Sequence, residues 1–165
     1  MHTHPVRRLL RDAVLTATMA SATSAGLGMC LARRQGKPAA ALPHAIAHMT
    51  DGTRTARRLK GSERTLTGLA LNFVGCLAWA CVAEAWASVR PYRQPLDVLA
   101  RGVAMASAAY AVDMHVLPPH AHPAYDQVLT GGARVALYAS LAATLTGRAA
   151  IAQLAGALGS NPRLG

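Results

Sequence analysis

The sequence predicts an all-α protein, an up-down bundle of four transmembrane helices with a short interfacial helix in the first loop. The first observation is the segment 66–89, in which Glu84 is the only charged side chain. Roughly 20 apolar residues at about 1.5 Å each cross a bilayer, so this segment is long enough. The second is a composition of 52% hydrophobic but only 4% aromatic residues. Such material suits helices packed closely in lipid better than a large soluble core. We expect one integral membrane domain over residues 1–165.

The third observation is the placement of the basic residues, which give the chain a net charge of +10. They are grouped between the apolar runs, at 7–11, 33–37, 54–64 and 90–93. A strongly basic chain often binds nucleic acid, but clusters that flank apolar segments are typical of contact with anionic lipid head groups. We therefore expect the lipid bilayer as partner and no nucleic acid. A soluble basic helical domain is the alternative class.

The first span is predicted at 13–32, a run without charge that is rich in Ala, Thr, Ser and Gly. A cleaved signal peptide is the alternative, but the run is longer than a usual signal core. The connection that follows holds an apolar island at 39–49, which is too short to cross a bilayer. We interpret the island as a helix lying in the interface or a shallow re-entrant turn. Asp51 and Gly52 end it with turn chemistry.

The remaining spans follow at short intervals. The second covers 66–89, and two prolines in the next loop separate it from the third, at 96–117. A proline-rich segment closes the third span, and Gly131-Gly132 opens the last one, at 133–158. Short connections predict an up-down arrangement with both termini on one face. Lys and Arg are nearly equal on the two faces, so orientation in the membrane stays open.

Glu84 is the first candidate for a specific role. It lies about five residues before the end of its predicted span, and an unpaired charge in hydrocarbon costs about 2.5–3.5 kcal/mol. We predict an ion pair with Arg148, or failing that with Arg101, which lie at comparable depth. We interpret the pair as fixing helix packing rather than serving transport. The chain has no GxSxG and no Gly-rich phosphate loop, so we expect no catalytic residues, no enzymatic activity and no cofactor.

A second candidate site is a group of His and Asp side chains on the opposite face. His44 and His48 are four residues apart, so a helix would project both on one side. Asp113 and His115, near the end of the third span, are two apart and would diverge on a regular helix. Imidazole and carboxylate together could bind a divalent metal such as zinc or relay protons. No HExxH or tight Cys/His spacing accompanies them. The same face also collects Asn72, His120 and His122.

Three short motifs run through the chain. Segment 43–52 reads PHAIAHMTDG, the second span carries Asn72, Trp79 and Glu84, and segment 112–126 begins with Val-Asp and contains spaced prolines before an acid. These motifs resemble those of uncharacterised small bacterial inner-membrane proteins with four predicted transmembrane helices. Asn72 stands where His is expected in such relatives. The resemblance implies a multi-pass inner-membrane location and a helical bundle, and it implies no particular activity.

The function that we expect is that of an accessory component or of a small-solute or ion-handling bundle. A metal- or proton-binding membrane protein that uses the His/Asp group is the alternative. The excess of arginine over lysine, 15 to 2, favours a GC-rich genome, which fits a bacterial source. Small residues at 68–76 and 102–109 are the expected helix contacts. A homo-oligomer or a membrane-protein partner is compatible with four thin helices.

Overall fold

The computed structural model describes residues 5–50, 59–118 and 121–159, and every regular element within these ranges is a helix. The predicted all-α class is therefore confirmed. The long elements are α1 (Pro5–Arg34), α3 (Gly61–Val89), α4 (Pro95–Ala111), which runs into the π-helix η3 (Val112–Val116), and α6 (Gly131–Gly159). The short ones are α2 (Ala41–Ala47), the 3-10 turn η1 (His48–Thr50) and α5 (Tyr125–Val128). The predicted turn at Asp51 and Gly52 lies outside the described residues.

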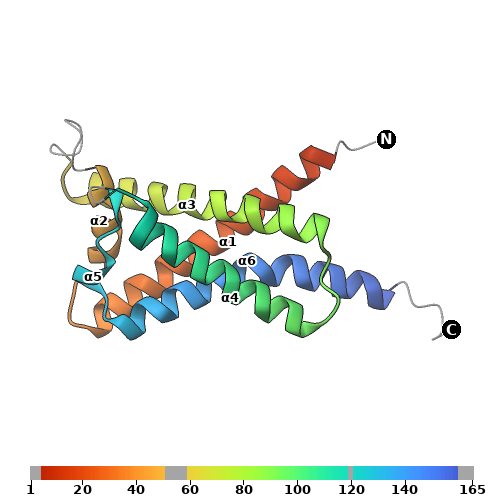
Figure 1. The fold of residues 1–165 in the computed structure, drawn as a ribbon. Helices are drawn as coiled ribbons and strands as arrows, with labels where there is room; N and C mark the ends of the chain where they lie inside the picture. Colours follow the sequence, from red (N-terminus) through yellow and green to blue (C-terminus); the bar gives the residue numbers. More distant parts are fainter. Residues whose placement is uncertain (1–4, 51–58, 119–120, 160–165) are drawn as a thin grey trace.

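The long helices lie side by side along one axis (Figure 1). In that view α1 and α4 run in one direction and α3 and α6 in the other. Helix α1 packs against both α3 and α6, whereas α4 packs mainly against α6. The start of α1 and the end of α6 lie at one end of the molecule, and α2 and α5 lie at the other. We refer to these as the terminal end and the α2 end.

Three of the described helices are long and apolar enough to cross a membrane. They are Val6–Arg34 in α1, Gly61–Val89 in α3 and Gly131–Gln153 in α6. Helix α4 has 17 residues, which measure only about 25 Å at 1.5 Å per residue. The predicted third span at 96–117 is thus divided between α4 and the π-helix η3, so the sequence overestimated the length of its regular α-helix.

The helices also begin earlier than the predicted spans. Helix α1 begins at Pro5 rather than near residue 13, and α3 begins at Gly61 rather than residue 66. The predicted spans follow the apolar runs alone. Arg, Leu and Glu in the flanking segments are good helix formers, so the helix continues where the apolar run stops.

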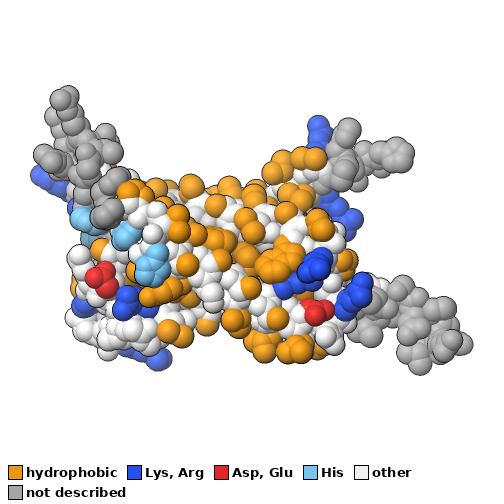
Figure 2. Space-filling model, in the orientation of Figure 1, with side chains coloured by type: hydrophobic (Ala, Val, Ile, Leu, Met, Phe, Trp, Pro, Cys, Tyr) orange, Lys and Arg blue, Asp and Glu red, His pale blue; other side chains and the backbone are white. Residues whose placement is uncertain are grey.

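The interior is built from small side chains and the outside from large ones. Most buried hydrophobic residues are alanines, among them Ala17 on α1 and Ala80 on α3, each 0% exposed. Large apolar side chains point outward on the same helices, as Val74 and Val135 do at 60% and 70% exposure. Figure 2 shows hydrophobic side chains over the middle of the molecule and Lys and Arg toward its two ends. Small interior residues let the helix backbones approach closely.

The short helix predicted in the first loop is present as α2, but it packs against α1, α3 and α5 instead of lying over the surface. Leu42 is only 2% exposed. Two glycines make room for the helix: a Cβ on Gly68 of α3 would lie 1.9 Å from the Pro43 carbonyl oxygen, and one on Gly28 of α1 would lie 2.1 Å from Leu42 Cδ2. Helix α2 therefore packs closely against α3 at the α2 end.

Candidate functional site

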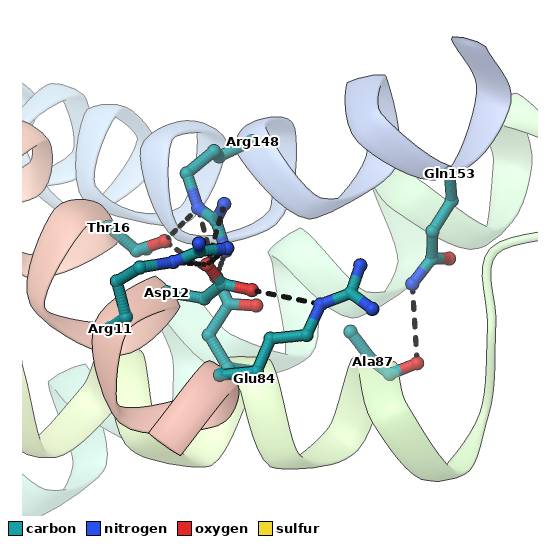
Figure 3. A network of polar contacts seen from close by, with 8 residues as sticks. Arg11, Asp12, Thr16, Glu84, Ala87, Arg148 and Gln153 are labelled. Atoms are coloured by element: carbon teal, nitrogen blue, oxygen red, sulfur yellow. Dashed lines mark hydrogen bonds and ion pairs between the residues drawn. The ribbon is translucent and has the colours of Figure 1, made fainter. Parts of the chain in front are cut away.

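Glu84 lies at the meeting point of three helices, toward the terminal end, and is 8% exposed. Arg148 on α6 approaches it with Nη2 at 2.6 Å and Nε at 3.2 Å from Glu84 Oε1. Thr16 on α1 donates to the same carboxylate oxygen at 2.6 Å and accepts from Arg148 Nε at 2.6 Å. The structure thus brings together the two residues of the predicted pair and adds a hydroxyl between them (Figure 3). The three side chains tie α1, α3 and α6 at one point.

A second carboxylate extends this network toward solvent. Asp12 Oδ1 lies 3.8 Å from Arg148 Nη1 and 3.0 Å from Arg11 Nη2, and Arg8 Nε lies 4.0 Å from Asp12 Oδ2. The Asp12 side chain is 17% exposed, whereas those of Arg8 and Arg11 are 77% and 69% exposed. Exposed ion pairs of this kind contribute about 0–1 kcal/mol to stability. Most of the stabilisation from the network is therefore expected from Glu84, Thr16 and Arg148.

The chemistry of this network favours a structural role. A buried ion pair needs good geometry and further hydrogen bonds to offset the cost of desolvation, and Thr16 supplies such a bond to Glu84. A guanidinium group does not release its proton in proteins. A proton relay between Glu84 and Asp12 would therefore have to bypass Arg148, which lies between them.

Arg101, the other partner considered for Glu84, has a different role. Its guanidinium carbon lies 4.4 Å from the ring centroid of Tyr92 and 5.5 Å from that of Trp86. Its Nη2 donates to the Pro91 carbonyl oxygen at 3.3 Å. Burial raises the pKa of the Tyr92 hydroxyl, and the charge of Arg101 opposes that shift. Arg101 therefore holds the loop between α3 and α4.

Gln153 on α6 bonds to the end of α3 and to the loop that follows it. It accepts from the Tyr92 backbone N–H at 2.7 Å and donates to the Ala87 carbonyl oxygen at 3.4 Å (Figure 3). The end of α3 and the loop that follows it are thus held from both α4 and α6.

A second polar contact joins α1 and α3 closer to the α2 end. Asn72 Nδ2 donates to Ser21 Oγ at 2.9 Å and to Ser24 Oγ at 3.3 Å. The Ser24 hydroxyl also lies 3.9 Å from Cys76 Sγ. Asn72, the polar residue of the second predicted span, therefore joins α3 to α1 by hydrogen bonds.

His44 and His48 share a pocket of about 350 Å³ at the α2 end, which Arg64 and Gln127 also line. His44 Nε2 lies 3.0 Å from Thr65 Oγ1, a contact in which the two atoms can exchange donor and acceptor roles. The two histidines thus lie on one side of the α2–η1 segment, as their spacing predicts.

Asp113 and His115 lie at the same end but elsewhere. Asp113 Oδ2 accepts a hydrogen bond from the Tyr138 hydroxyl at 2.7 Å. The rings of His115 and Tyr110 pack edge to face, with their centroids 6.1 Å apart. Neither lines the histidine pocket. Across the described ranges, no three His, Cys, Asp or Glu side chains are grouped so that they could hold a metal ion. His120 lies outside those ranges.

The predicted metal ligands are therefore not assembled, and the reason lies in the packing of the helices. Helix α2 packs against α3 and α5, while η3 continues α4, which packs against α6. The two pairs therefore share one end of the molecule but belong to different elements, and the pocket beside His44 and His48 is lined from α2, η1, α3 and the α5 region rather than from η3.

The partners that sequence reasoning missed are Asp12, Thr16 and Tyr138. A signal existed for the first two: they are four residues apart on α1, and the spacing continues to Ala20 and Ser24, which a helix places on one face. A stripe of small and polar residues in a membrane-length helix is typical of a helix contact. Tyr138 offered no comparable pattern.

No protein-family model, curated protein or solved structure matches this chain. The resemblance to small four-helix inner-membrane proteins stays a prediction. The function is therefore inferred from the buried network, from the distribution of apolar side chains and from the surface of the molecule.

Proposed function

We propose that this chain is a four-span integral protein of a bacterial inner membrane, with an up-down bundle fold, that acts as a non-enzymatic accessory component. The observation that supports this proposal is that large apolar side chains lie on the outside of the molecule and small ones in its interior. Val74, Val135 and Ile151 are 60–71% exposed, while alanines fill the interior. Exposed apolar area costs about 25 cal/mol per Å² in water and no such cost in hydrocarbon. An outside of this kind suits lipid.

The fourth span of this proposal is α4 together with η3. The 17 residues of α4 and the 5 of η3 follow one another without a break, and at about 1.5 Å each they extend about 33 Å. This length is enough to cross a hydrocarbon core about 30 Å thick. The alternating directions of α1, α3, α4 and α6 support an up-down bundle (Figure 1).

The accessory role is supported by the way the buried polar groups are used. Glu84 and Thr16 bond to each other and to Arg148, and Ser24 bonds to Asn72. These groups hold helices together, as expected of a protein that acts by lateral association within the membrane rather than by chemistry at a site.

Cysteine labelling tests the membrane location. In a background where Cys30, Cys76 and Cys81 are replaced by alanine, Val74→Cys should not react with a water-soluble maleimide in opened membranes. The matched variant Arg93→Cys, in an exposed loop, should react, and both should react after denaturation in SDS. Equal labelling of the two in native membranes, or release of the chain by a carbonate wash, would refute the proposal.

Ion handling is the second candidate, and the observation that favours it is an ionisable side chain, Glu84, inside a helix long and apolar enough to cross a membrane. It predicts proton flux into vesicles that contain the purified protein and an internal pH dye. That flux should be lost in Glu84→Gln and kept in Glu63→Gln, whose side chain is exposed in the first turn of α3. The accessory role predicts the same leak from vesicles with and without protein.

A further inference from the structure

Helices α4 and α6 form a groove of about 1000 Å³ along the outside of the molecule. Its middle is apolar: Leu99 and Val103 of α4 face Ala139, Ala143 and Gly147 of α6 across it. This volume is at the upper end of the range of about 300–1,000 Å³ that is usual for small-ligand sites. The groove can therefore hold a long apolar chain.

One end of the groove is cationic. Arg134 lines it in the first turns of α6, next to Gly131 at the helix N-terminus. The Nε atom of Arg134 is buried and, among the described residues, has no hydrogen-bond partner. A helix N-terminus adds partial positive charge at the same place. The neighbouring Tyr138 hydroxyl is already bonded to Asp113. Among the described residues, this end therefore holds a guanidinium nitrogen without a partner, while the rest of the groove is open to an apolar occupant.

We propose that this groove binds an anionic phospholipid, with its phosphate at Arg134 and one acyl chain between α4 and α6. The inference rests on the proposed membrane location. Basic pockets between transmembrane helices are a known way to bind acidic head groups. An arginine and exposed tyrosine near a span end also match the depth of the head groups. Tyr110, 43% exposed, lies at this end.

A second copy of the chain fits this groove less well. Each copy carries a net charge of +10, so a second copy adds positive charge where Arg134 needs negative charge. A 20-residue helix of about 10 Å diameter fills a cylinder of about 2,400 Å³, more than twice the groove. An acyl chain is narrower and brings its own phosphate.

The length of the groove tells how far the lipid reaches. The stretch from Arg134 to Ile151 measures about 26 Å along the α6 axis, but one leaflet contributes only about 15 Å of hydrocarbon. An acyl chain that starts at Arg134 therefore passes Ala139 and ends short of Ile151. These two positions give a matched pair of substitutions.

The test uses the full chain purified in a maltoside detergent. Phosphatidylglycerol or phosphatidylcholine with identical acyl chains is added, and bound lipid is counted by native mass spectrometry. The wild-type protein should retain about fivefold more phosphatidylglycerol, the effect of roughly one basic residue at a membrane surface. Arg134→Gln should bring the two lipids to equal retention. Arg33→Gln, an exposed arginine in the last turn of α1 at the same end, should keep the preference.

The apolar part of the inference has its own variants. Ala139→Phe fills the groove near Arg134 and should lower retention of both lipids, whereas Ile151→Phe should leave retention unchanged. A preference that survives in Arg134→Gln, or is lost equally in Arg33→Gln, would overturn the head-group assignment. A dimer that Ala139→Phe turns into a monomer, with lipid retention unchanged, would assign the groove to a second copy.

Failure of this inference is separable from failure of the proposed function. Labelling of Val74→Cys in native membranes removes the membrane location, whatever lipid binds in detergent. Protection of Val74→Cys together with equal retention of both lipids by the wild-type protein keeps the location and removes only the lipid site.

Discussion

Replacing Arg148 by glutamine takes away the only cation that the described residues place within ion-pairing distance of Glu84. The Glu84 carboxylate then keeps one donor, Thr16. Breaking a buried pair from one side costs about 3–5 kcal/mol because a charge is left uncompensated. In Glu84→Gln, by contrast, Arg148 still has Asp12 at 3.8 Å, so we expect a smaller loss, about 1.5–3 kcal/mol, the size of a hydrogen bond to a charged group. The structure thus predicts an asymmetry between two substitutions of one pair.

The assay is thermal unfolding in detergent, followed by the fluorescence of Trp79 and Trp86. At about 2–4 °C per kcal/mol for a protein of this size, Arg148→Gln should lower the Tm by about 6–20 °C. The double variant should lose less than the sum of the single losses, with a coupling free energy of about 1–3 kcal/mol. Glu63→Gln is the matched control and should stay within about 0.5 kcal/mol of wild type, as most exposed substitutions do.

Two outcomes would refute this reasoning. Additive losses in the double variant would mean that Glu84 and Arg148 do not stabilise each other. A larger loss in Glu84→Gln than in Arg148→Gln would mean that Asp12 does not support Arg148, and that the carboxylate has donors other than those described above.

Three further substitutions test the packing by the same thermal assay. Gly68→Ala places a Cβ 1.9 Å from a carbonyl oxygen of α2 and should cost about 1–3 kcal/mol; Gly75→Ala meets nothing within 4 Å and should be neutral or stabilise by up to about 1 kcal/mol, so equal effects would contradict the docking of α2. Asn72→Leu removes its bonds to α1 and should cost about 1 kcal/mol; an unchanged Tm would show that these bonds contribute nothing. Tyr138→Phe deprives Asp113 of its donor and should cost about 1–3 kcal/mol; a stabilised variant would contradict that bond.

The long helices could be predicted because each is a local property of the chain. In the run 66–89 the backbone satisfies its own hydrogen bonds as a helix, the conformation that lipid requires of a single segment. Their limits were harder to predict. The polar residues before the run continue α3 back to Gly61, and the third span changes from the α-helix α4 to a π-helix at Val112.

The candidate sites were likewise predictable in part. A charge at the depth of Glu84 demands a partner, so an arginine at similar depth could be expected from the sequence alone. The choice between Arg148 and Arg101 could not, because depth along a helix says nothing about which helices are neighbours. The structure places α6 against α1 and α3, which brings Arg148 to Glu84, while Arg101 stacks on Tyr92 beside the loop between α3 and α4.

By itself, the sequence determined the all-α class, the apolar character of the long helices and the presence of charges that need partners. These follow from composition and from spacing along one segment. Only the tertiary structure decided that Thr16 and Asp12 join the buried pair, that His44 and His48 lie apart from Asp113, and that α4 and α6 form a groove that ends at Arg134. Each of these depends on the lateral order of the helices, which is set by close contacts between segments far apart in the chain.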